Sequence, residues 1–192
     1  LANWTFITMS SELRVDKIVP TDGVPTGGAG GIIQIQQTVK TDFLSISTTD
    51  TMTDVVSVNI TPHFNTSKIF VMVSGERSSD NGNQFGMLFL SRVVGGTTEN
   101  ICIGDARGSS IRCTMSAMKM GGSTSHDPTA SITTMPYHIE FLDSPNTTSV
   151  CTYKLRATNA HTGNFSLGGT HDTGDDNRTS TPTVITVMEF SV

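Results

Sequence analysis

The segment Lys68-Ile69-Phe70-Val71-Met72-Val73 carries the densest apolar signal in the chain and decides the fold class. Such a run of β-branched and large apolar residues is typical of a central strand that is covered on both faces. Just upstream, Val56, Val58 and Ile60 alternate with polar residues. That period of two predicts a strand with one buried face, and the three-to-four spacing of an amphipathic helix is nearly absent from the chain.

The same pattern extends in both directions and predicts about ten short strands. Outside residues 56–73, strands are expected at residues 33–39, 43–46, 85–92, 100–104, 111–118, 130–142, 150–159 and 183–190. The breaks between them carry turn residues, as in Ser78-Ser79-Asp80-Asn81-Gly82. Many short strands at near-even spacing predict an all-β fold, an antiparallel β-sandwich or jelly roll.

Residues 1–31 differ from the rest and predict an extended N-terminal arm ahead of a head at residues 32–192. Four glycines lie within residues 27–31, and such a segment loses too much conformational entropy to order on its own. Met9 is typical of a translation start, so residues 1–8 are expected to be an upstream extension or a misassigned start. The apolar residues of the arm need a surface to cover them, so we expect neighbouring subunits to order Leu13, Val15, Ile18 and Val19.

The composition excludes several classes of function. The net charge is −5 and no Lys/Arg run is interleaved with aromatic residues, which argues against nucleic-acid binding. The longest apolar stretches are far shorter than the roughly 20 residues of a membrane span. Only 15% of residues are charged, so the surface is rich in hydroxyl groups. Cys102, Cys113 and Cys151 lack the short spacings of a zinc site, and we expect them to be free buried thiols.

Several short motifs share their order with a known group of proteins. The segment Ser11–Ile18, the Gly-rich stretch and Gly31–Gln37 resemble the N-terminal part of tail-fibre and other virion structural proteins of marine and cyanobacterial phages. Further shared positions are Ile60-Thr61-Pro62, Ser67-Lys68-Ile69, Gly104-Asp105, Arg107-Gly108 and Phe141-Leu142-Asp143-Ser144-Pro145. The resemblance implies a homo-oligomeric β-sandwich head, with three chains expected, similar in layout to the tumour-necrosis-factor-like jelly roll. It implies no catalytic motif and no cofactor, and leaves the position on the virion open.

Two loops, residues 119–128 and 161–182, hold the residues best suited to bind a host-surface glycan. Counting strands backwards from residues 183–190 places both of them, together with residues 95–98 and 62–67, at the end opposite the C-terminus. The carboxylates also suit a hard cation, but their spacing does not match a calcium-binding loop, so a solvated loop or an inter-subunit salt bridge is expected instead of a metal. The receptor-binding candidates are His126, Asp127, His171, Asp172, Asp175, Asp176, Asn177 and Arg178.

The chain is not expected to be an enzyme. Its five histidines and many serines lie in no nucleophile-elbow motif, and one Trp and two Tyr are few for a sugar-cleaving platform. We therefore expect a structural protein of the extracellular virion. A tail-fibre or spike subunit would anchor to other virion proteins by its arm and attach to the host by its head. The alternative is a capsid decoration or head-fibre protein with a purely structural role, and a polysaccharide depolymerase is less expected.

Overall fold

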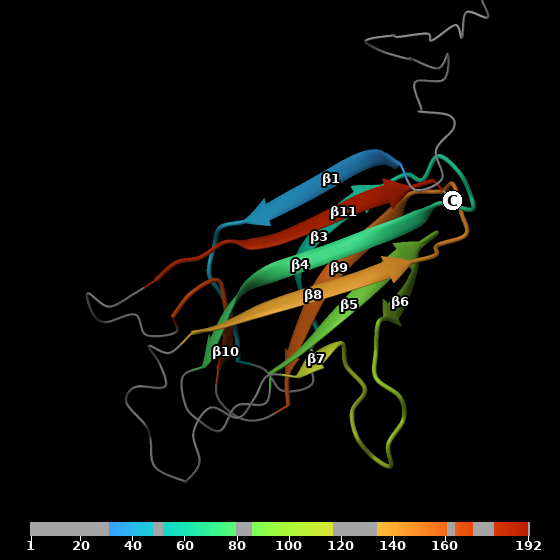
Figure 1. Cartoon of the computed structure of the whole chain (residues 1–192). Coiled ribbons are helices and arrows are strands. Elements are labelled where there is room, and N and C mark those ends of the chain that lie inside the picture. Colours follow the sequence, from blue (N-terminus) through green and yellow to red (C-terminus); the bar gives the residue numbers. More distant parts are fainter. Residues whose placement is uncertain are drawn as a thin grey trace, which may run out of the picture.

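The computed structural model describes residues 31–47, 52–79, 86–116, 134–160, 164–170 and 179–191. The arm residues Leu13, Val15, Ile18 and Val19 lie outside these ranges. The described chain contains eleven strands and no helix, arranged as two antiparallel sheets packed against each other (Figure 1). The predicted all-β sandwich is therefore confirmed.

Six strands form one sheet, called here the β4 sheet. Its order is β1-β11-β4-β10-β2, and β8 pairs with β4 as well. Its members are β1 (Ile32–Lys40), β2 (Leu44–Ile46), β4 (Lys68–Ser79), β8 (Met135–Asp143), β10 (Phe165–Leu167) and β11 (Thr183–Phe190).

Five strands form the other sheet, called here the β5 sheet. Its order is β3-β9-β5-β6, and β7 also pairs with β5. Its members are β3 (Thr53–Ile60), β5 (Gly86–Val94), β6 (Thr97–Ile101), β7 (Met115–Ser116) and β9 (Cys151–Asn159).

Three of the strand positions are single strands interrupted along their length. β11 and β10 pair one after the other with the same edge of β4, because β8 occupies its opposite edge. On the other side of these two strands, β1 pairs with β11 and β2 pairs with β10, so β1 and β2 also form one interrupted strand. In the β5 sheet, β6 and β7 share the edge of β5 that faces away from β9.

Counting each interrupted strand once leaves four strand positions in each sheet. The β4 sheet then reads β1/β2, β10/β11, β4, β8, and the β5 sheet reads β3, β9, β5, β6/β7. Along the chain every connection crosses from one sheet to the other, except the β5–β6 hairpin and the interruptions themselves. This is the order of an eight-stranded jelly roll, in which two Greek keys wrap around one core.

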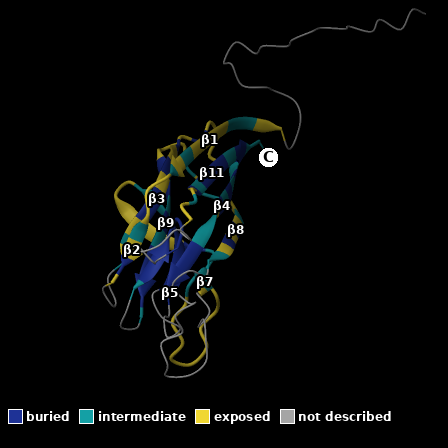
Figure 2. Ribbon diagram, turned by 90° about the vertical axis from the view of Figure 1, so that its left-hand side faces the viewer, coloured by how far each residue is buried: buried dark blue, intermediate teal, exposed yellow. Residues whose placement is uncertain are grey.

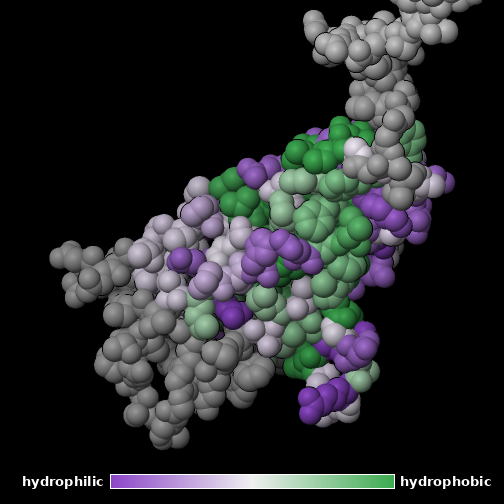
Figure 3. All heavy atoms as spheres, viewed as in Figure 1, coloured by the Kyte–Doolittle hydropathy of each residue, from purple (hydrophilic) through white to green (hydrophobic). Residues whose placement is uncertain are grey.

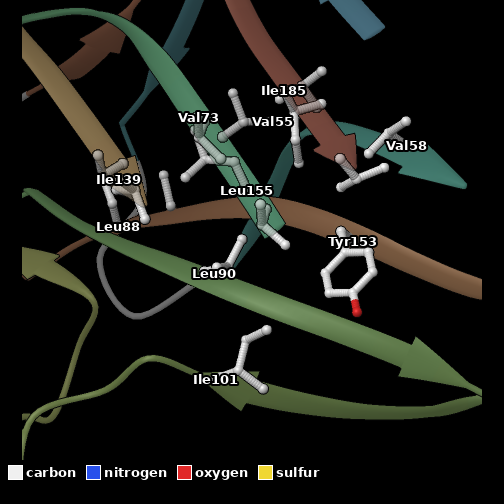
Figure 4. Close-up of a cluster of buried hydrophobic side chains, with 14 of the residues drawn as sticks. Val55, Val58, Val73, Leu88, Leu90, Ile101, Ile139, Tyr153, Leu155 and Ile185 are labelled. Carbon is white, nitrogen blue, oxygen red and sulfur yellow. The ribbon is translucent and has the colours of Figure 1, made fainter. Parts of the chain in front are cut away.

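Alternate side chains from both sheets fill the space between them. Val73 of β4 and Ile185 of β11 meet Leu88, Leu90 and Leu155 of the β5 sheet, and all five are fully buried (Figure 4). β5 and β9 each have six of nine residues buried, and much of their length is dark blue in Figure 2. The period-two alternation in the sequence therefore corresponds to one row of inward-facing side chains on each strand.

Four expectations about individual strands were wrong. β4 is covered on one face only, because Phe70 and Met72 on its outer side are half-exposed. β4 also runs through the expected turn as far as Ser79, and the short β10 was not expected at all. The strand expected at residues 100–104 ends at Ile101, since Cys102 adopts a left-handed φ of 55° that an extended strand cannot continue.

The two chain termini of the head meet at one end of the sandwich, which we call the arm end. The amide of Ser191 donates a hydrogen bond to the carbonyl of Gly31 over 3.3 Å. The opposite end is called the loop end. Gly31, the last residue of the glycine-rich segment, therefore lies beside the end of the C-terminal strand.

The strand count placed two loops at the wrong end. Residues 62–67 lie at the arm end, because Lys68 pairs with Phe190. Residues 95–98 lie there too, because Val94, Cys151 and Ile60 are aligned across the β5 sheet. Segments 100–104 and 111–118 were counted as two strands of opposite direction. β6 and β7 instead run the same way along β5, and this removes one reversal.

A glycine close to the loop end offers a test of how tightly the sandwich is packed. A Cβ added to Gly86 would lie 2.4 Å from the ring of Phe165, which is almost fully buried. We expect Gly86→Ala to lower the free energy of unfolding by about 1–3 kcal/mol, since the ring cannot move aside in a closed core. Urea denaturation measures the loss.

The matched control is Gly104→Ala, because an added Cβ there meets nothing within 4 Å. It should leave stability within about 0.5 kcal/mol of the parent protein. Equal losses in both variants would contradict the packing shown for the β5–β10 contact.

Candidate functional site

The loop end gathers the connections whose flanks define a candidate binding surface. Ile46 aligns with Phe165 and Phe165 with Ser79, while Gly86 aligns with Asn159. The connections from β2 to β3, β4 to β5, β7 to β8 and β9 to β10 therefore all start and finish at this end. The arm end carries segments 61–67, 95–96 and 144–150, and the longest connection, residues 117–134, belongs to the loop end. Loops carried on a rigid sandwich are a common place for binding residues.

The predicted receptor-binding residues all belong to loops outside the described residues. They are His126, Asp127, His171, Asp172, Asp175, Asp176, Asn177 and Arg178. The structure does describe the strand ends that flank the first of these loops, and they lie at the loop end: Ser116 pairs with Met87 and Met135 pairs with Arg77. Whether the eight side chains come together is thus still a prediction.

The second of these loops is held at its base by a short two-stranded neck between β10 and β11. The amide of Thr170 donates to the carbonyl of Thr179 at 3.1 Å, and the amide of Thr179 donates to the Thr170 hydroxyl at 3.1 Å. Ser78 ties this neck to β4 by donating to the carbonyl of Gly169 at 2.7 Å. A Cβ on Gly169, whose φ is +139°, would lie 2.0 Å from the carbonyl oxygen of Thr179, so this neck requires glycine.

An inward-facing arginine closes the core at the loop end. Arg77 follows Val71 and Val73 on the buried side of β4 and is only 9% exposed. Its Nη1 donates to the carbonyl of Ser116 in the β5 sheet at 3.1 Å. No ion pair to this guanidinium is present among the described residues, and burial lowers the pKa of Arg77. The period of two through Val71 and Val73 already pointed inward at position 77, and that signal could have identified it.

A tyrosine beside this arginine completes the polar layer at the loop end. The Tyr137 and Thr183 hydroxyl oxygens lie 3.1 Å apart in a hydrogen bond that joins β8 to β11. Burial raises the pKa of Tyr137 to about 12, so the phenol stays protonated at neutral pH. Hydroxyl groups and one cation therefore lie at the loop end of the core.

Two buried carboxylates close the core at the arm end, and sequence reasoning assigned neither of them. The first, Glu189, occupies the last inward position of β11 and is 0% exposed. It accepts hydrogen bonds from the backbone amide of His63 at 2.7 Å, the Ser67 hydroxyl at 2.6 Å and the Gln34 amide at 2.6 Å. His63 Nδ1 lies 2.9 Å from Glu189 Oε2. Burial opposes ionisation, but the hydrogen bonds from His63, Ser67 and Gln34 outweigh it and hold the pKa of Glu189 below its usual value.

This arrangement is structural in its geometry and differs from a hydrolytic triad. In a triad the serine hydroxyl bonds to the imidazole, which removes its proton. Here Ser67 donates to Glu189 directly, and His63 bonds to the same carboxylate from its backbone and its ring. The carboxylate thereby fastens the β3–β4 connection and β1 to the end of β11.

The second carboxylate, Asp143, joins the two sheets. It terminates β8 and accepts two hydrogen bonds from Arg92 of β5, at 2.8 and 2.7 Å, and one from the Tyr153 hydroxyl of β9 at 2.7 Å. Arg92 also donates to Glu99 of β6 at 2.7 Å. Burial together with the Asp143 charge raises the pKa of Tyr153. Because every partner comes from the opposite sheet, this cluster fixes the sheet separation at the arm end.

The interruption between β6 and β7 is bridged by one side chain. The Thr114 hydroxyl accepts from the amide of Leu90 at 2.8 Å and donates to the carbonyl of Ile101 at 3.3 Å. Residues 102–113 therefore project from the sheet edge without breaking the ladder. All three cysteines are free, as expected, but only Cys151 is buried, and Cys102 and Cys113 are half-buried in this segment.

Within the described ranges, no group of three His, Cys, Asp or Glu side chains could hold a metal ion. In the same ranges, no helix has the length and apolar character needed to cross a bilayer. No known protein-family model matches the chain, and no curated protein shows significant similarity to it.

Removing the charge of Glu189 tests whether this network stabilises the arm end. We expect Glu189→Gln to lower the free energy of unfolding by about 1–3 kcal/mol. One carboxylate oxygen becomes an NH₂ group, which cannot accept the hydrogen bonds that the surrounding groups donate. Glu140→Gln is the control, since Glu140 is exposed beside His138 and surface ion pairs contribute about 0–1 kcal/mol. Equal stability of both variants would contradict a structural role for Glu189.

The pH dependence gives an independent readout of the same carboxylate. A pKa held below the usual 4.5 stabilises the folded state above that pH, and this contribution is lost as the pH falls through the lower folded-state pKa. The stability difference between the parent protein and Glu189→Gln should therefore shrink below about pH 4.5. A difference that stays constant from pH 7 to pH 3 would show that the ionised form carries no advantage.

Proposed function

We propose that this chain is a structural protein of a phage virion, a tail-fibre or spike subunit that anchors by its N-terminal arm and presents a trimeric head for attachment to a host surface. The observation that carries the proposal is that the two ends of the sandwich carry different parts of the chain. Gly31 and Ser191 meet at one end, while the connections rich in His, Asp and Asn leave from the other half of the molecule.

The arm end has the features that an attachment base needs. Two buried carboxylates tie the strand ends of both sheets together there. Strand ends held in this way keep that end of the head rigid. At the opposite end, the buried polar side chains of Arg77, Tyr137 and Thr183 lie in the core near the flanks of the candidate loops.

The alternative of a capsid decoration protein with a purely structural role draws on a different observation. The buried carboxylates Glu189 and Asp143 are both engaged in hydrogen bonds within the head, and neither is exposed at the surface. In that case the loops would only seal the apex of an assembly. The two functions predict different outcomes for variants of the loop residues.

Adsorption separates them. Replacing Asp172, Asp175 and Asp176 by Ala in the intact virion should leave particle assembly normal and lower adsorption to host cells roughly tenfold, the effect of losing about 1.4 kcal/mol of binding free energy. Asp54→Ala is the control, because this exposed carboxylate pairs with Lys154 and Arg156 on the outer face of the β5 sheet. Adsorption is measured as the rate at which free particles disappear from a cell suspension.

Unchanged adsorption of the triple variant, with normal particles, would overturn the attachment role of this loop and leave the structural alternative. Release of reducing sugar from host capsule by the purified chain would instead point to a depolymerase.

A further inference from the structure

The two outer faces of the sandwich differ sharply in chemistry. On the β5 sheet the outward residues pair with one another, as Lys154 and Arg156 do with Asp54 and as Thr152 does with Asn59 at 2.7 Å. Such a face is satisfied in water. The outer face of the β4 sheet is largely apolar, as Figure 3 shows over β1, β11 and the neighbouring parts of β4 and β8.

Strand register aligns these apolar side chains into a row across the whole β4 sheet. Ile35 lies beside Met188, Met188 beside Phe70, and Phe70 beside Leu142. Ile35 is 52% and Leu142 is 55% exposed, and the two between them are half-buried. A second pair, Ile32 and Phe190, lies next to this row at the arm end. Val39 and Val184 form a third pair at the other end of β1 and β11. We call these eight side chains the apolar face.

The edge strands of the β4 sheet differ in the same way. On β8, Pro136, His138 and Glu140 place a proline and charges along the edge, which discourages contact with another chain. β1 has no charge or proline from Ile32 to Val39, and no described strand pairs with its free edge. The apolar face thus continues to an unguarded edge.

We propose that the apolar face is covered by a second copy of this chain. The face follows β1 and β11 for about seven residue steps, ~23 Å, over a width of two strands, ~10 Å, and its central row widens to four strands, ~19 Å, at ordinary sheet spacings. Its plan area is therefore on the order of 300 Å², and protruding side chains make the accessible area larger. A standard protein contact, in which each partner buries ~800 Å², would cover this face together with its polar rim.

The arm is the other occupant to consider, and its dimensions fit poorly. Residues 13–19, fully extended along β1 and β11, would cover a strip ~23 Å long but only one strand wide, ~5 Å, which is about half of the two-strand width and leaves Phe70 and Leu142 uncovered. A folded head offers a surface of matching width, and every copy carries the same apolar groups. The inference rests on the proposed assembly function and identifies the surface through which that assembly forms.

The test measures the mass of the full 192-residue chain by light scattering as it is diluted. We expect an oligomer of 20.5 kDa subunits, and we expect Ile35→Asp with Leu142→Asp to raise the concentration of half-dissociation by at least about 100-fold. Both positions are exposed in the single chain, so the double variant should melt near the parent temperature. Ser57→Asp with Asn59→Asp, on the outer face of the β5 sheet, is the matched control and should keep the parent mass.

Each remaining outcome overturns the inference. A parent chain that is still monomeric at about 50 µM would show that no second copy covers the face, because that concentration is ample for a specific contact. An oligomer that survives the double variant would place the contact elsewhere. If Leu13→Asp with Ile18→Asp dissociates the oligomer while the apolar face is left unchanged, the contact belongs to the arm. Subunit number and adsorption are read separately, so a dimer would contradict the trimer while leaving the apolar face in place.

Discussion

The architecture depends on the inward packing of alternate residues of β4 against the β5 sheet. Ile69, Val71 and Val73 are fully buried, and β4 pairs with β11, β10 and β8 along its two edges. The pleat then forces the intervening residues outward whatever their chemistry. Phe70 and Met72 are apolar and point away from the core between the two sheets, so the strand that organises the sandwich also places apolar side chains on its outer face. The burial that stabilises the head and the proposed docking of a second copy therefore involve opposite faces of the same strand.

The ends of the core are closed by charge in an asymmetric way. Glu189 and Asp143 close the arm end, and Arg77 closes the loop end. A buried charge is tolerated only where hydrogen bonds replace water. The two carboxylates receive theirs from several strands each, which binds those strands into one unit. Within the described residues Arg77 makes one cross-sheet hydrogen bond, to Ser116, so it joins fewer strands than either carboxylate does. This difference supports the proposal that the arm end serves as the base of the head.

Interruptions of strands give the jelly roll its projecting segments without opening its sheets. The Thr114 hydroxyl bridges the gap between β6 and β7, and the Thr170–Thr179 neck closes the gap between β10 and β11. Each interruption leaves the chain direction unchanged. A count of apolar segments along the sequence treats every segment as a reversal, so it assigned residues 62–67 and 95–98 to the wrong end although it found most of the strands.

The sequence by itself determined the fold class, because period-two alternation is local and needs no knowledge of partners. It also located the apolar strands and the free thiols, and it proposed loop residues whose chemistry is suited to binding. Only the tertiary structure decided which segments share an edge, which end each connection occupies, and which strands supply the partners of Glu189, Asp143 and Arg77. Those features depend on register between residues far apart in the sequence, 155 positions for Gln34 and Glu189 and 39 for Arg77 and Ser116. No local pattern encodes such a distance, since a strand specifies its own faces but not the neighbour that will cover them.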